Sequence, residues 1–134
     1  MRGQPLSNPG FGLVVREDDG KGLFAEVRRA HTFWARLRGL LGRKSLGPEE
    51  GLWLERCNAI HMAGMRFAID AIFLDREGRV VAVRENVRPW GIAGPVKGAR
   101  EVLEVAAGSA DRLQIKPGQG LRPAWKKERP PRQA

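Results

Sequence analysis

Residues 69–87 read IDAIFLDREGRVVAVRENV. Two runs rich in apolar and β-branched residues, 69–74 and 80–87, flank the polar segment Asp75-Arg76-Glu77-Gly78. This pattern predicts an antiparallel hairpin, because the runs favour extended backbone and the glycine tolerates the conformation of a tight turn. Within the second run, side chains alternate between two faces, which is typical of a half-buried strand.

Outward from this hairpin, short strand-like runs separated by Gly and Pro predict the rest of the fold. Further strands are expected at 11–16, 23–30, 52–54 and 101–106, with a last short strand at Leu121. Apolar residues take helical spacing over about residues 32–42, and a single helical turn capped by Ser109 is expected near 109–114. We therefore expect a mainly β fold, a compact antiparallel barrel or sandwich with one amphipathic helix.

Length and composition predict a single domain. The chain has 134 residues, 42% hydrophobic and 29% charged, and no apolar run approaches the roughly 20 residues that cross a bilayer. We expect a flexible N-terminus over 1–10, a β-rich domain over 11–122 and a basic, Pro-rich flexible tail over 123–134. Residues 1–10 lack the apolar segment of a secretory signal, and one cysteine cannot form an internal disulfide. These features predict a cytoplasmic protein that does not bind membranes.

The net charge of +9 allows binding to nucleic acid or another polyanion. Residues 122–134 hold five basic residues and one acid, so +4 of this charge lies in that segment. A second basic cluster consists of Arg28, Arg29, Arg36, Arg38, Arg43 and Lys44. Because clustered charge is also common on ordinary solvated surfaces, polyanion binding is kept as an alternative function.

Residues 57–68, CNAIHMAGMRFA, bring together reactive side chains just before the hairpin. Cys57, His61 and Met65 have the spacing of a soft-metal loop, but closed metal sites need more supported ligands, so we expect no metal and no cofactor. A catalytic alternative makes Cys57 the nucleophile, His61 its base and Asp70 the orienting carboxylate. A further interpretation is that Met62 and Met65 fill the core.

Asp70 interrupts an otherwise apolar strand and must be paired if it is buried. His61 and Arg66 are its natural partners by sequence proximity, and Trp90, in Pro-Trp-Gly, offers a flat stacking surface. We therefore predict a ligand site formed by His61, Arg66, Asp70 and Trp90.

Several motifs occur in the order seen in one known family: RGLLGR (38–43), IH (60–61), GMRF (64–67), ID (69–70), FLD (73–75), GRVV (78–81), VLE (102–104) and AG (107–108). On these residues the chain resembles the domain-of-unknown-function family 192 over roughly residues 23 to 122. The resemblance implies a compact, mostly β domain, intracellular and exported members, and no established activity. Met62 and Ala68 depart from the threonine and proline common at those positions.

The sequence thus favours a non-enzymatic binding or accessory module with a small-ligand pocket around His61 to Asp70 and Trp90. Its partner would be a small molecule or a protein. The alternatives are a small hydrolase or metal-dependent enzyme using Cys57, His61 and Asp70, and a polyanion-binding protein.

Overall fold

The structure, a computed structural model, describes residues 11–30 and 42–126. The amphipathic helix predicted at 32–42 falls almost wholly outside the described residues, as do His31, the segment 1–10 and residues 127–134. The elements are β1 Phe11–Arg16, β2 Gly22–Ala30, β3 Glu50–Glu55, β4 Ile60–His61, β5 Ile69–Leu74, β6 Val80–Val87, β7 Ile92–Ala93, β8 Glu101–Ala106, α2 Ser109–Arg112 and β9 Leu121–Lys126.

The predicted hairpin is confirmed with the expected bounds. β5 and β6 pair antiparallel, and Asp75 closes the turn by accepting hydrogen bonds from the N–H groups of Glu77 and Arg79, both at 2.9 Å. Gly78 has φ 84°, which a residue with a Cβ rarely adopts. β5 has neighbours on both sides, β6 and β8, and all six of its residues are buried.

One large sheet has the strand order β6-β5-β8-β3-β2-β1-β9, and β4 and β7 form a second, two-stranded sheet. The predicted mainly β fold is confirmed, and the large sheet is mixed rather than antiparallel throughout, because β2 and β3 run parallel. A parallel pair needs a long crossover connection, and here the connection spans residues 31–49. Both strands were predicted from the sequence, but their relative direction was not.

Two apolar clusters cover the two faces of the sheet. Residues 69, 71 and 73 of β5 enter the first cluster with the buried side chains of Met62 and Met65, which confirms that these methionines fill the core. Residues 72 and 74 enter the second cluster, together with Trp53 and the segment after α2. Because side chains alternate along a strand, β5 supplies both clusters and becomes the centre of the fold.

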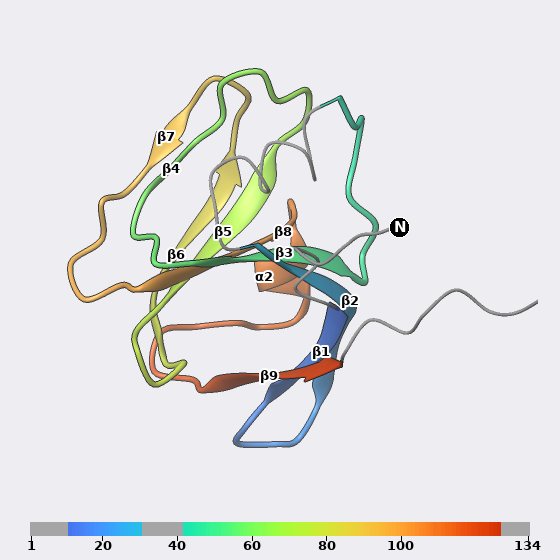
Figure 1. Cartoon of the computed structure of the whole chain (residues 1–134), viewed down its shortest axis with the longest axis vertical. Coiled ribbons are helices and arrows are strands. Elements are labelled where there is room, and N and C mark those ends of the chain that lie inside the picture. The colour runs from blue at the N-terminus through green and yellow to red at the C-terminus, as the bar shows by residue number, and fades with distance from the viewer. Residues whose placement is uncertain (1–10, 31–41, 127–134) are drawn as a thin grey trace, which may run out of the picture.

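The sheet curls but does not close into a barrel, so the fold is sandwich-like. At one corner the segment leading into β9 meets the β5–β6 turn, where Leu121 N donates to Gly78 O at 2.8 Å and Val80 N donates to Gln119 O at 2.8 Å. Among the described strands, β9 lies at the edge of the sheet and pairs with β1 alone. Figure 1 shows β9 at one end of the molecule and the β4–β7 sheet at the other.

Two boundaries differ from the sequence-based prediction. β9 continues to Lys126, beyond the expected start of the tail, and tolerates Pro123 because an edge strand need not use every N–H. The helical turn α2 is present, but Ser109 makes no capping hydrogen bond, and the N-cap residue is Gly108 with φ 94°. Instead, the Asp70 carboxylate on β5 accepts hydrogen bonds from N–H groups at the start of this turn.

Candidate functional site

β4 and β7 hold two loops together on the outside of the first cluster. His61 pairs with Ile92 and Ile60 with Ala93 in antiparallel register. The pairing continues past the strands, because Met62 N donates to Gly91 O at 2.8 Å and Trp90 N donates to Met62 O at 2.9 Å. The structure thus brings the segments of His61 and Trp90 together, which the sequence predicted only as two irregular loops.

Trp90 lies in an unfavourable backbone conformation with its side chain in solvent. Gly91 N donates to Arg88 O at 2.9 Å, Pro89 occupies the second position and Trp90, with φ 69°, the third. These are the features of a type II turn, which normally places glycine at the third position. The indole is 73% exposed, and Ile92, two residues later, is 74% exposed.

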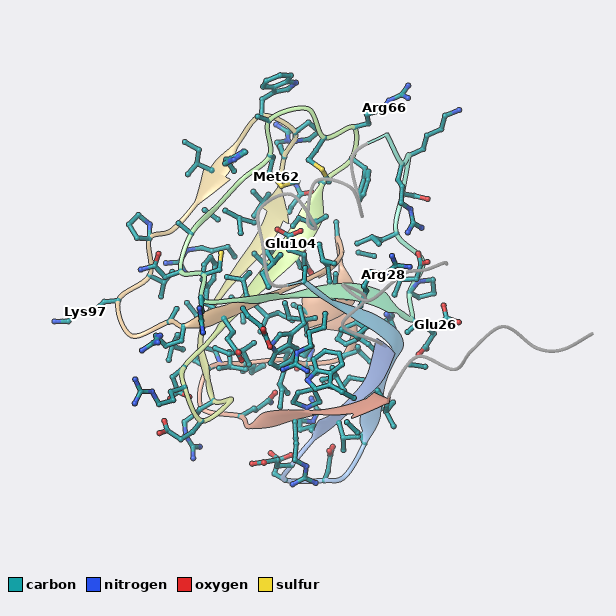
Figure 2. All side chains as sticks on the ribbon, viewed as in Figure 1. Glu26, Arg28, Met62, Arg66, Lys97 and Glu104 are labelled. Carbon is teal, nitrogen blue, oxygen red and sulfur yellow. The ribbon has the colours of Figure 1, made fainter. Side chains whose placement is uncertain are left out.

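The predicted contact residues of the preceding loop also face outward. His61 and Arg66 are exposed, whereas Met62 and Met65 between them are buried. Figure 2 shows Arg66 pointing away from the body of the protein and Met62 pointing into it. Cys57 is half-buried, and its thiol donates to Ala59 O at 3.0 Å. Of these exposed side chains, His61 lies directly opposite Ile92 across the β4–β7 pair.

Asp70 has a different environment from the one predicted. Its carboxylate is fully buried and accepts three backbone hydrogen bonds, from Asn86 N at 2.9 Å, Gly108 N at 3.0 Å and Ala110 N at 2.9 Å. The expectation that His61 or Arg66 pairs with this carboxylate is wrong. Asp70 instead joins β5 to β6 and to the start of α2, and supplies the helical turn with acceptors that Ser109 does not provide.

The orientation of Asp70 also bears on the catalytic and metal alternatives. Its three donors are all backbone groups, so the carboxylate does not orient the His61 ring for a Cys57 nucleophile. Within residues 11–30 and 42–126, no group of three or more His, Cys, Asp or Glu side chains is placed to hold a metal ion. In the same ranges, no helix has the length and apolar character needed to cross a bilayer.

A pocket that sequence reasoning missed lies beside β9. It has a volume of about 260 Å³. It is lined by side chains from the ends of several strands and from the β5–β6 turn: Glu17, Arg29, Trp53, Glu55, Arg76, Glu77, Gly78, Glu101, Leu121, Arg122, Pro123 and Trp125. These residues are scattered along the sequence, so only the strand pairing brings them together.

Two tryptophans form the apolar part of this pocket. The rings of Trp53 and Trp125 meet edge to face, with centroids 5.9 Å apart and an interplanar angle of 85°. The Trp125 ring crosses β1 at Gly12, where a Cβ atom would lie 2.5 Å from its Cε3 atom. The absence of a side chain at Gly12 therefore allows Trp125 to turn toward Trp53.

The charged groups of the pocket are partly paired with one another. Arg29 Nε lies 2.6 Å from Glu55 Oε2, and the Arg29 guanidinium lies 5.3 Å from the centroid of the Trp125 ring. Trp53 Nε1 donates to Glu101 Oε1 at 3.0 Å. Burial, with a smaller contribution from the charge of Glu55, raises the pKa of Glu101 although the Trp53 hydrogen bond opposes the shift.

The predicted basic cluster is divided among separate ion pairs. Arg29 pairs with Glu55, and Arg43 Nη2 lies 2.8 Å from Glu50 Oε1. Arg36 and Arg38 lie outside the described residues.

A second buried carboxylate, Glu104, also went unnoticed in the sequence. It lies in β8 opposite Leu52 and Ala71, on the face of the first cluster. Figure 2 places it on the same side of β3 as Met62. In the sequence, Glu104 stands in a short run of Val and Leu. Apart from this strand pattern, nothing in the sequence indicates that its side chain is buried.

The fold and the outward-facing loops define a class: a β domain built on one curled mixed sheet, with a small two-stranded sheet covering one face. The chain belongs to the DUF192 family, described as "Uncharacterized ACR", whose sequence profile matches residues 14–123. The family resemblance predicted from the motifs is thereby confirmed.

Relatives and solved structures agree with this assignment. The chain is 33% identical over 114 residues to a UPF0127 protein of Thermococcus sibiricus, covering 79% of this chain and 71% of the relative. It is 35% identical over 119 residues to a UPF0127 protein of Pyrococcus horikoshii, covering 84% of this chain and 98% of the relative.

Two crystal structures share the fold. A protein of unknown function from Novosphingobium aromaticivorans superimposes with a TM-score of 0.75 and 27% identity, covering 90% of this chain and 91% of that one. A proposed transcription regulator from Sinorhizobium meliloti superimposes with a TM-score of 0.77 and 23% identity, covering 90% of this chain and 98% of that one. Both solved structures thus share the fold of this chain.

Proposed function

We propose that this protein is a non-enzymatic binding module that contacts a partner protein through the surface formed by His61, Arg66, Arg88, Trp90 and Ile92. This surface is called the β4–β7 face. The proposal keeps three of the residues predicted from sequence, His61, Arg66 and Trp90, as contact residues. Asp70 becomes a structural residue, because its carboxylate is buried and bound to backbone groups.

The backbone conformation of Trp90 is the main observation that supports the proposal. A non-glycine residue at positive φ costs about 1–3 kcal/mol, and such strain persists where the surroundings or a function require it. Burial of the indole does not offset this cost in the isolated chain, since 73% of Trp90 is exposed. Contact with a partner would bury the indole and give the strained turn a purpose.

The composition of the face suggests the chemistry of the partner. Tryptophan and arginine are the residue types most often responsible for binding energy at protein interfaces. Arg66 and Arg88 are exposed, and neither forms an ion pair in the described part of the chain. The matching surface would therefore combine an apolar pocket for Trp90 with acidic side chains.

The proposal is tested by quantitative affinity capture from cells that produce the protein. We expect at least one partner whose recovery falls about 30-fold in the Trp90→Gly/Ile92→Ser double variant, the loss that corresponds to a hot spot of about 2 kcal/mol. Leu13→Ser is the matched control, because Leu13 is another exposed apolar residue but lies on β1.

Identical sets of captured proteins for the wild type and the double variant would contradict the proposal. Equal losses for the double variant and Leu13→Ser would also contradict it, since that result indicates nonspecific apolar adsorption. An isolated partner should then lose affinity when its acidic residues are neutralised.

A further inference from the structure

The pocket beside β9 is lined by the residue types that are typical of small-ligand sites. Trp125 and Trp53 meet at a right angle there, and Leu121 and Pro123 extend the apolar lining along β9. Trp53 is almost fully buried, so its ring is fixed, whereas Trp125 is only partly buried and leaves part of its ring accessible. A volume of about 260 Å³ suits a small molecule or one long side chain.

The pocket lining holds one more acid than base, in a protein that is basic as a whole. The whole chain has a net charge of +9, yet the pocket lining holds four glutamates and three arginines. Two of the arginines are already engaged: Arg29 with Glu55 at 2.6 Å, and Arg122 with Glu17 at 3.5 Å. The other two glutamates, Glu77 and Glu101, form no ion pair within the described residues.

Glu101 is the most enclosed of these remaining acids. Its Oε1 atom accepts the Trp53 indole N–H, and within the described residues its Oε2 atom accepts no hydrogen bond. Glu101 faces Glu55 directly across the β3–β8 pairing, so two carboxylates approach each other at this point. Because Arg29 already pairs with Glu55, Glu101 is the carboxylate of this pair left to accept a hydrogen bond from a positively charged ligand.

We infer that this pocket binds the ammonium group of an alkylamine, with Glu101 as the acceptor and the methylene chain packed against Trp125. The same chemistry is presented by a free amine and by the lysine side chain of another protein. This site shares no residue with the β4–β7 face, and Figure 1 shows strand β9, which lines it, at the end of the molecule opposite β4 and β7.

The inference is tested on the full chain by following the Trp53 indole N–H resonance in ¹H–¹⁵N spectra during titration with n-butylamine at neutral pH. Trp53 reports directly because its N–H donates to Glu101. We expect a saturable shift with a Kd on the order of 1–10 mM, consistent with the few heavy atoms of the probe.

The Glu101→Gln variant separates specific binding from general attraction. Glutamine retains an acceptor for Trp53 but loses the charge, so affinity should fall at least about 10-fold. The matched control is Glu77→Gln, which removes the same charge at the exposed rim and should change affinity less than about threefold.

A second titration with Nα-acetyl-lysine methylamide distinguishes the two sources of the ammonium group. Binding of both probes supports a lysine side chain as occupant, and binding of n-butylamine alone supports a free amine. A Trp53 resonance that does not move with either probe overturns the inference, as do equal losses of affinity in the Glu101→Gln and Glu77→Gln variants.

Discussion

Folding shifts the pKa values of two glutamates, Glu101 and Glu50, in opposite directions. Burial, reinforced by the charge of Glu55, raises the pKa of Glu101 above its usual value. The Gly47 N–H, which donates to Glu50 Oε1 at 2.7 Å, lowers the pKa of Glu50 with help from Arg43. The folded state therefore favours the neutral form of Glu101 and the ionised form of Glu50.

These opposite shifts predict opposite pH dependences of stability. The contribution of Glu101 is complete below its unfolded pKa and is lost as the pH rises through its higher folded pKa. Glu101→Gln should therefore raise the free energy of unfolding at pH 7, by less than about 1 kcal/mol because the group is partly solvated. The gain should disappear below about pH 4, where wild-type Glu101 is also neutral.

Glu50→Gln is the control of opposite sign. The stabilisation from Glu50 is present above its unfolded pKa and is lost as the pH falls through its lower folded pKa. This variant should lose stability at pH 7, by less than about 1 kcal/mol, and approach the wild type in acid. Urea unfolding at several pH values measures both variants, and shifts of the same sign would contradict the assignment.

The environments of single residues were predictable from the sequence in some cases and not in others. The alternation of β5 places Asp70 on the same face as Ile72 and Leu74, whereas Met62 and Met65 lie on the other. Proximity in sequence suggested a pairing of Asp70 with His61, but the period of the strand argues against it. The exposure of Trp90 was not predictable, because Pro-Trp-Gly indicates a turn without indicating where the indole points.

Among the elements, the connection made by Asp70 links three parts of the fold. The carboxylate of β5 binds Asn86 at the end of β6 and two N–H groups at the start of α2. Asn86 has φ 53° and Gly108 φ 94°, so the carboxylate acts where the backbone turns sharply. A helical turn of four residues is too short to be stable alone and depends on such contacts.

Replacing Asp70 should weaken this connection strongly. In Asp70→Asn the amide keeps one acceptor, but its NH₂ group faces backbone donors, which leaves buried N–H groups unsatisfied. We expect a loss of about 2–5 kcal/mol in the free energy of unfolding and faster hydrogen exchange at Gly108 and Ala110.

The control for this variant is Asp75→Asn, since Asp75 also accepts two backbone hydrogen bonds through one oxygen but in an exposed turn. It should cost less than about 1 kcal/mol, because its donors can turn to water. Equal losses for the two variants would show that burial does not distinguish the two carboxylates.

The strands themselves were largely predictable. The runs at 11–16, 69–74, 80–87 and 101–106 have the expected bounds, because each is a β-branched or apolar segment between turn residues. The parallel pairing of β2 and β3 was not predictable, since it depends on a crossover rather than on local sequence. The pocket beside β9 was missed for the same reason, as its lining comes from strands distant in the chain.

At the scale of the whole molecule, the two surfaces proposed to bind have different physical origins. The pocket beside β9 is lined by residues from the ends of several strands and from the β5–β6 turn, so strand pairing creates it. The β4–β7 face is presented by a strained turn outside the core. If this face serves binding rather than folding, its residues can change without loss of stability.

The free energy of unfolding of Trp90→Gly, measured by urea denaturation at neutral pH, tests this central claim most directly. Glycine is the preferred residue at the third position of a type II turn, and most of the indole is exposed in the wild type. We predict an unchanged or higher value, by up to about 1 kcal/mol, together with loss of the partner. A decrease of more than about 1 kcal/mol would mean that Trp90 stabilises the fold, and would contradict its assignment as a contact residue held outward for binding.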